Sequence, residues 1–199
     1  MISLRSDIVG AVMAGGKSSR MGSEKALLAV EGRPMISYVT GTLSQLFSEV
    51  IICGADPQRY EFLGFRVVRD VFQRCGPLAG IHTALTHSAG RPVFVLSCDM
   101  PFVPPELVHH ILASADRPHT RIAFSEGVLQ PLCGIYGQEC LPVAEEDLSE
   151  GKYSIIRMLK KVKHSAVKID ASLPFYADFI MRNVNRPEDY EEIRMRRKE

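Results

Sequence analysis

The sequence has 199 residues, a formal net charge of +1 at pH 7, and 46% hydrophobic and 24% charged residues. These are globular values, and we expect residues 1–199 to form a single domain with a substantial core. The near-neutral charge argues against a protein dedicated to nucleic acid, and no apolar run approaches the roughly 20 residues of a membrane span. Five scattered cysteines without a Cys-x-x-Cys pair, and a first segment without a signal-peptide layout, favour reduced thiols in a cytoplasmic protein.

A short apolar run at residues 8–13 comes first and predicts a buried strand. It leads into two glycines, Gly15 and Gly16. Basic residues then follow within nine positions, at Lys17, Arg20 and Lys25. Glycines let the backbone approach a ligand, and successive N–H groups in such a turn bind anions. The pattern predicts a site for a phosphorylated ligand at the carboxyl edge of a parallel α/β sheet.

The spacing of this loop matches neither Gly-x-x-x-x-Gly-Lys-Ser/Thr nor Gly-x-Gly-x-x-Gly. Instead, residues 16–25 resemble the loop of nucleotidyltransferases that bind NTPs through Gly-x-Ser-x-Arg-Met-Gly followed by Lys. The triplet Ala14-Gly15-Gly16 resembles the molybdenum cofactor guanylyltransferase family in particular, because the related cytidylyltransferases typically read Ala-Ala-Gly there. Glu24 stands where that family usually has Asp, which keeps the charge.

The next elements alternate helices and strands. Pro34 suits the first turn of a helix whose apolar face runs to Phe47, and strands are expected at 50–53 and 65–68. This alternation implies parallel strands with right-handed crossovers. Asp70 follows the last of these strands, at the same edge as the glycine loop. Its carboxylate could accept from the N1–H and N2–H₂ groups of guanine or serve as an ordinary turn or helix cap, and the resemblance supports the base-binding role.

Residues 76–80 (Gly-Pro-Leu-Ala-Gly) predict the start of a helix whose N-terminal N–H groups could approach a ligand. Residues 92–97 are the most strand-like run, expected at the centre of the sheet, and Asp99 follows directly. A carboxylate there is a natural Mg²⁺ ligand, because Mg²⁺ combines one or two carboxylates with substrate phosphates and waters. Residues 98–102 (Cys-Asp-Met-Pro-Phe) look like the metal-binding turn of the same family, so Asp99 is the expected metal ligand.

Two further strands are expected at 120–124 and 130–136, and Pro131 indicates an edge position or a strand start. The second strand resembles the acceptor-side strand of the family. A pterin ring could lie against Leu132 and Tyr136, or the segment could be an ordinary core strand.

A basic segment with a helical pattern spans residues 152–163. Such a run is typical of a solvated helix face. Alternatively, Lys152 or Arg157 could contact the phosphate of the acceptor.

Residues 183–189 (Asn-Val-Asn-Arg-Pro-Glu-Asp) resemble the C-terminal signature of the family, whose asparagines lie near the metal and the acceptor. Asn185 could equally be a helix N-cap, with Pro187 in the first turn. Arg186 replaces the Thr that is usual in the family.

The resemblance implies a Rossmann-like three-layer α/β/α fold with a mostly parallel sheet, of the nucleotide-diphospho-sugar transferase type. It implies transfer of GMP from GTP to the phosphate of molybdopterin, with Mg²⁺ as cofactor and release of pyrophosphate. Molybdenum-insertion and molybdoenzyme-maturation proteins are the expected partners of a monomeric chain. The alternatives are a CTP-dependent cytidylyltransferase acting on molybdopterin or a sugar-alcohol phosphate, and a silent nucleotide-binding regulator.

The resemblance also implies a set of site residues. The expected catalytic residues are Lys25 on the α-phosphate, Arg20 with Lys17 on the leaving phosphates, and Asp99. The expected ligand-binding residues are Met13, Ala14, Gly15, Gly16, Lys17, Lys25, Asp70, Gly76, Pro77, Leu78, Asp99, Asn183 and Asn185.

Overall fold

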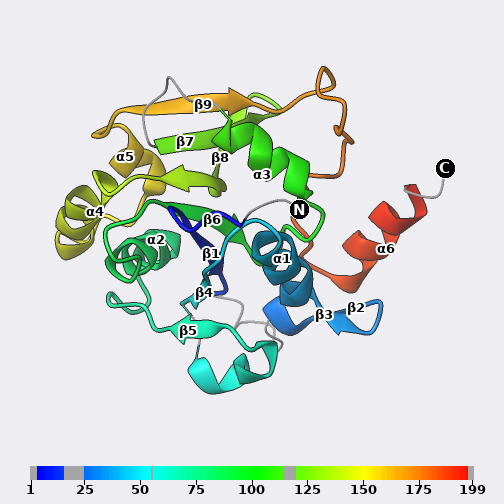
Figure 1. The fold of residues 1–199 in the computed structure, drawn as a ribbon, viewed down its shortest axis with the longest axis horizontal. Coiled ribbons are helices and arrows are strands. Elements are labelled where there is room, and N and C mark those ends of the chain that lie inside the picture. Colours follow the sequence, from blue (N-terminus) through cyan, green and yellow to red (C-terminus); the bar gives the residue numbers. More distant parts are fainter. Residues whose placement is uncertain (1–3, 16–24, 55, 114–119, 197–199) are drawn as a thin grey trace.

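The structure, a computed structural model, describes residues 4–15, 25–54, 56–113 and 120–196 (Figure 1). A seven-stranded sheet runs through it in the order β5-β4-β1-β6-β8-β7-β9. Its strands are β1 (Val9–Met13), β4 (Val50–Cys53), β5 (Arg66–Val68), β6 (Val93–Ser97), β7 (Thr120–Ser125), β8 (Val128–Tyr136) and β9 (His164–Lys168). Neighbouring strands are parallel except where β8 pairs with β6 and β7. The predicted mostly parallel sheet is confirmed, with β6 at its centre.

Helices cover both faces of the sheet (Figure 1). The helices are α1 (Met35–Ser44), α2 (Pro77–Thr86), α3 (Pro105–Leu112), α4 (Cys140–Ser149), α5 (Ile155–Leu159) and α6 (Pro187–Arg196). One core lies between the sheet and α1 and α3, and a second lies between the sheet and α2, α4 and α5. Short 3₁₀ turns connect β4 to β5 at η3 (Pro57–Arg59) and η4 (Glu61–Leu63). Within the described ranges, no helix is long and apolar enough to cross a membrane.

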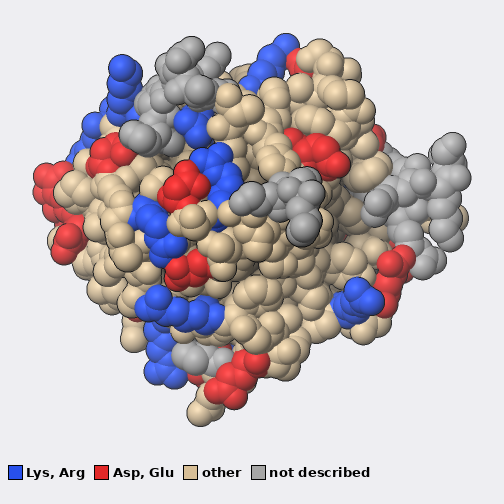
Figure 2. Space-filling model, in the orientation of Figure 1, with Lys and Arg blue, Asp and Glu red and all other residues tan. Residues whose placement is uncertain are grey.

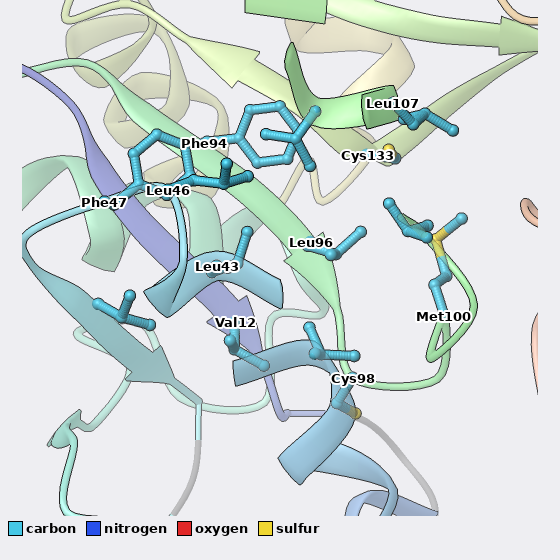
Figure 3. Close-up of a cluster of buried hydrophobic side chains, with 14 of the residues drawn as sticks. Val12, Leu43, Leu46, Phe47, Phe94, Leu96, Cys98, Met100, Leu107 and Cys133 are labelled. Atoms are coloured by element: carbon cyan, nitrogen blue, oxygen red, sulfur yellow. The ribbon is translucent and has the colours of Figure 1, made fainter. Parts of the chain in front are cut away.

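Strand β1 is buried along its whole length because helices pack on both of its faces. On the face shown in Figure 3, Val12 lies among side chains from α1 and β6. The rings of Phe47 and Phe94 stack there with centroids 5.9 Å apart. Gly10 permits this packing, since a Cβ at that position would lie 3.0 Å from the Phe47 ring.

The parallel strands end at one edge of the sheet, and backbone hydrogen bonds continue beyond the strands. Ala14 N–H donates to the Cys53 carbonyl at 3.0 Å, and Cys98 N–H donates to the Met13 carbonyl at 3.1 Å. The segments that follow β1, β4 and β6 therefore lie side by side. This edge is where a doubly wound sheet binds its ligand.

Strand β8 contradicts the expectation for Pro131. The proline lies in an interior strand, between β6 and β7, and not at an edge or a strand start. The register of β8 against β7 shifts between Ile122, which faces Gly134, and Ala123, which faces Gln130. Pro131 falls in this irregularity and has no register partner in β6 or β7, which is the kind of place where a strand tolerates proline.

Tyr136 is a core residue and does not offer a ring face to a pterin. Its side chain is fully buried, and its hydroxyl donates to the Pro131 carbonyl oxygen at 2.5 Å. Burial raises the pKa of this phenol well above its ordinary value. The core-strand alternative for this position is therefore correct.

Candidate active site

Glycines at the ends of β1 and β4 bring two backbone segments into contact. A Cβ on Gly54 would lie 2.9 Å from the Gly15 Cα and 3.1 Å from Oδ2 of Asp70. Gly54 also has φ +86°, which residues with a side chain rarely adopt. In α2, a Cβ on Gly80 would lie 2.9 Å from the Met13 sulfur and 3.9 Å from Oδ1 of Asp70. The Asp70 carboxylate is thus approached closely by the backbone of two segments, at Gly54 after β4 and at Gly80 in α2.

The Asp70 carboxylate is half-buried, and its Oδ1 is buried without a hydrogen-bond partner in the described part of the chain. Burial raises the pKa of Asp70 to about 6, although a hydrogen bond with the Thr83 side chain acts in the opposite direction. Thr83 Oγ1 also accepts from the Val71 N–H at 3.1 Å, which fixes the loop after β5. An unsatisfied carboxylate oxygen in such a place suits a ligand that brings N–H donors.

The start of α2 lies beside this carboxylate. Gly76 has φ +75° and precedes the helix, and Pro77 is its first residue. The side chain of Leu78 is fully buried in the core, so only its backbone could face a ligand. The same holds for the buried side chains of Met13 and Ala14, which pack into the two cores.

A second group of predicted residues meets where the two ends of the chain come together. Lys25 begins the short turn η2 (Lys25–Leu27), and its Nζ donates to Oδ1 of Asn185. The N–H of Val184 donates to the Asp99 carbonyl oxygen at 2.8 Å. Asn183 and Asn185 flank that anchor, so the structure brings them to Lys25 and Asp99. The amide oxygen of Asn185 accepts from Lys25, which favours the site role of that side chain over the N-cap alternative.

Asp99 follows β6 in a tight turn in which the Met100 N–H donates to the Ser97 carbonyl at 3.2 Å. Its Oδ1 is buried and has no hydrogen-bond partner among the residues that the structure describes. Within those same residues, no cluster of three or more His, Cys, Asp or Glu side chains could hold a metal ion. A single carboxylate with an unsatisfied oxygen fits a cation that takes its other ligands from phosphate and water.

Three predicted residues of the glycine loop, Gly16, Lys17 and Arg20, lie outside the described residues. Their roles stay predictions from the sequence.

The basic side chains of α5 and its neighbourhood face carboxylates of the same region. Arg157 and Lys161 both pair with Asp147, at 3.5 Å and 2.9 Å, and Lys152 pairs with Glu150. Lys and Arg are likewise interspersed with Asp and Glu on the face seen in Figure 2. These pairings favour the solvated-helix alternative over a contact of Lys152 or Arg157 with the acceptor.

Sequence reasoning missed Gly54 and Thr83 as parts of the site. A glycine directly after a predicted strand is a detectable signal for Gly54. No local pattern indicates Thr83, because its relation to Asp70 depends on how α2 packs against the loop after β5.

A family model described as MobA-like NTP transferase domain matches residues 10–166. A relative from Pelotomaculum thermopropionicum, named "Probable molybdenum cofactor guanylyltransferase", is 38% identical over 188 residues, which cover 94% of this chain and 91% of the relative. The solved structure of molybdopterin-guanine dinucleotide biosynthesis protein A from Archaeoglobus fulgidus is similar in fold, with a TM-score of 0.79 at 24% identity over 96% of this chain and 100% of that one.

The fold is also similar to that of 4-diphosphocytidyl-2C-methyl-D-erythritol synthase from Anaerococcus prevotii, with a TM-score of 0.73 at 14% identity over 98% and 97% of the two chains. The three-layer nucleotidyltransferase fold is therefore shared by enzymes named for different nucleotides. The family itself is shown by the family model, which matches residues 10–166, and by the 38% identity to the relative from Pelotomaculum thermopropionicum. This chain belongs to the family of MobA-like NTP transferases.

Proposed function

We propose that this protein transfers GMP from GTP to the phosphate of molybdopterin, releasing pyrophosphate and forming molybdopterin guanine dinucleotide. The observation that carries the proposal is the buried Oδ1 of Asp70 at the carboxyl edge of the sheet, which has no hydrogen-bond partner among the described residues. The name of the relative from Pelotomaculum thermopropionicum supports the same reaction.

Asp70 supports guanine as the base. Guanine presents N1–H and N2–H₂ side by side, and one carboxylate can accept from both groups. Cytosine and uracil offer no such pair of donors. Gly15 and Gly54 place no side chain between the ends of β1 and β4 and the carboxylate. A base that cannot satisfy Asp70 leaves a buried carboxylate oxygen unpaired, which disfavours its binding.

The reaction needs positioning and charge neutralisation more than acid–base chemistry. An oxygen of the acceptor phosphate attacks the α-phosphorus of GTP, and the bond from that phosphorus to the β-phosphate oxygen breaks. The electron pair leaves with pyrophosphate. The acceptor phosphate is largely ionised at neutral pH, since its second pKa is about 6, so no strong base is required.

Lys25 is assigned to the α-phosphate, where negative charge builds in the transition state. The Lys25 ammonium group donates a hydrogen bond to the amide oxygen of Asn185, and this contact orients it before substrate binds. Lys17 and Arg20 keep the predicted role of binding the leaving phosphates.

Asp99 would hold Mg²⁺ through its buried Oδ1, for which the described part of the chain provides no hydrogen-bond partner. When bound, the ion supplies positive charge that offsets the repulsion between the acceptor phosphate and the triphosphate.

The test is a transfer assay with GTP labelled in the α-phosphate, molybdopterin and Mg²⁺, run in parallel with labelled CTP and ATP. The proposal expects labelled dinucleotide from GTP alone and one pyrophosphate per transfer. Incorporation of CMP instead would establish the cytidylyltransferase alternative. Tight GTP binding without any transfer to molybdopterin would establish the silent nucleotide-binding regulator.

A further inference from the structure

We infer that Asp189 is a positioning residue for the transfer reaction, acting on Lys25 through Asn185. This inference rests on the role proposed above for Lys25. Asp189 holds the backbone of Asn185, and the Asn185 side chain holds the ammonium group that meets the α-phosphate.

The hydrogen bonds of Asp189 carry the first step. Its Oδ2 accepts from the Asn185 N–H at 2.8 Å and from the Arg186 N–H at 2.9 Å. These two N–H groups precede α6 (Pro187–Arg196), so one carboxylate oxygen fixes the chain direction immediately before the helix. Since Oδ1 of Asn185 accepts from Lys25, the backbone that Asp189 fixes is the one that aims this amide.

A small apolar cluster fixes the helix itself. Tyr190, the residue after Asp189, is buried and stacks on Phe102, with ring centroids 5.1 Å apart and an interplanar angle of 19°. Phe102 ends the turn that carries Asp99. Val184 is fully buried in the same cluster. The first turn of α6 is thus seated on the turn of the proposed metal ligand.

The same cluster reaches the segment after Lys25. The small hairpin of β2 (Ala29–Val30) and β3 (Arg33–Pro34) follows η2, and Val30 is buried beside Tyr190. The Tyr38 hydroxyl donates to the Val30 carbonyl at 3.0 Å, and the rings of Tyr38 and Tyr190 lie 6.4 Å apart. The three segments that carry Lys25, Asp99 and Asn185 therefore pack against the same apolar cluster. Asp189, next to Tyr190 of that cluster, connects it to Asn185 by accepting from the Asn185 N–H.

The neighbouring residue offers a matched control. Glu188 is an exposed acidic residue in the same first turn of α6. Replacing Glu188 or Asp189 by alanine removes the same charge from the same helix end, but only Asp189 accepts from the Asn185 N–H. A difference between the two variants therefore reports the positioning hydrogen bonds and not the helix dipole.

The experiment measures kcat and KM for GTP in Asp189→Ala, Glu188→Ala, Asn185→Ala and the double variant of Asn185 and Asp189, each corrected for its folded fraction. Asp189→Ala is expected to lower kcat about 10- to 100-fold, as misplacement of a reacting group does, with KM for GTP within about twofold. Glu188→Ala is expected to match wild type. The double variant is expected to lose no more than Asn185→Ala alone, because both changes remove the same effect.

Equal kcat in Asp189→Ala and Glu188→Ala, or multiplied losses in the double variant, would overturn the inference. If Asp189→Ala does not fold, Asp189→Asn takes its place: its amide keeps one acceptor oxygen, and an intermediate kcat is expected. A kcat of Asp189→Asn equal to that of wild type, together with equal effects of Asn185→Ala in the Asp189→Asn and wild-type backgrounds, would then overturn the inference.

A second readout separates this inference from the proposed function. Lysines are labelled by reductive ¹³C-methylation, and the Lys25 resonance is assigned by its loss in Lys25→Arg. Without any substrate, Asp189→Ala is expected to move this resonance toward its position in Asn185→Ala, while Glu188→Ala leaves it in place. That shift in a protein that transfers no GMP would retain the positioning and reject the reaction. An unmoved resonance in an active enzyme would reject the positioning alone.

Discussion

Gly15 and Gly54 lie so close that a Cβ on Gly54 would be 2.9 Å from the Gly15 Cα. This backbone contact joins the chain after β1 to the chain after β4, and a Cβ on Gly54 would also lie 3.1 Å from Oδ2 of Asp70. The base pocket proposed for guanine is therefore built on the absence of side chains at two positions that are far apart in sequence.

Gly54→Ala is expected to destabilise the protein by about 1–3 kcal/mol, because the new Cβ meets Gly15 at a backbone φ of +86°. GTP binding is expected to weaken as well, since the Cβ would lie 3.1 Å from the Asp70 oxygen. Urea unfolding and calorimetric titration with GTP measure the two effects. Gly41→Ala in α1 is the control: nothing lies within 4 Å of its new Cβ, and removing a helical glycine stabilises by about 1 kcal/mol. Equal unfolding free energies for the two variants would contradict the proposed contact.

GTP affinity is expected to fall as the pH drops below about 6, because guanine needs the ionised form of Asp70. Burial raises the pKa of this carboxyl from 3.8 to about 6. The folded state therefore binds this proton more tightly than the unfolded state does. The stabilisation that results is complete below pH 3.8 and is lost as the pH rises through 6.

Asp70→Asn removes both effects and is the control for titration of the nucleotide itself. The variant is expected to bind GTP about 10- to 100-fold more weakly at pH 8, where wild-type Asp70 accepts as a charged group. It is also expected to melt at a higher temperature than wild type at pH 8, since no buried charge remains. Titration calorimetry and thermal melting from pH 5 to 8 give both results. Wild-type GTP affinity in the variant would remove Asp70 from the base pocket.

Asp99→Ala is expected to abolish GMP transfer at all Mg²⁺ concentrations, while the fold persists. Its buried Oδ1 has no hydrogen-bond partner in the described chain, so its removal leaves no internal group unpaired. A Mg²⁺ titration of the initial rate, with circular dichroism as the folding check, measures this. Glu106→Ala in the first turn of α3 is the matched exposed carboxylate and is expected to keep full activity. Near-normal turnover of Asp99→Ala would exclude the metal role.

Lys25→Ala is expected to lower kcat much more than it raises KM for GTP. The contact of Lys25 with the α-phosphate should strengthen as charge develops, and only such contacts accelerate the chemical step. Steady-state kinetics at saturating molybdopterin measure this. A change confined to KM would assign Lys25 to ground-state binding of the triphosphate instead.

Asp147→Asn is expected to destabilise the protein by on the order of 2 kcal/mol without changing kcat, because Asp147 is a buried carboxylate paired with Arg157 and Lys161. Burial alone would raise the pKa of Asp147, but Lys161 and Arg157 hold it below its ordinary value. Its stabilising effect is therefore present above pH 3.8 and is lost as the pH falls below that value. Unfolding curves at pH 7 and pH 3 measure this effect. A loss of GMP transfer at pH 7 in a folded variant would instead favour the alternative in which the basic segment of residues 152–163 contacts the acceptor.

The sequence predicts the parallel half of the sheet well for a physical reason. Strands covered on both faces read as continuous apolar runs, as residues 8–13, 50–53 and 92–97 do. Positions at their ends then follow from the shared edge, which is how Asp70 and Asp99 could be assigned. The structure keeps both carboxylates at that edge, and in the described ranges each has one buried oxygen without a hydrogen-bond partner.

The wrong expectation for Pro131 and the open question at Asn185 both lie where pairing between distant segments decides the outcome. Pro131 follows the rule for edge strands, yet a register shift against β7 admits it to an interior strand. For Asn185 the sequence leaves two roles open, helix N-cap and site residue. The structure favours the site residue, because the Asn185 side chain accepts from Lys25 while Asp189 accepts from the N–H groups before the helix. Local patterns contain no information on which distant side chain competes for a hydrogen bond.

Lys25 and Asn185 are separated by 160 positions in the chain. At synthesis rates of about 5–20 residues per second, roughly 8 to 32 s pass between the incorporation of the lysine and that of its partner. A growing chain has already received Met13, Asp70 and Gly80 by then, so every residue proposed to recognise guanine precedes the residue that aims the lysine. On the proposed roles, guanine recognition therefore depends on residues that are synthesised early, whereas the positioning of Lys25 depends on one of the last segments of the chain to be made.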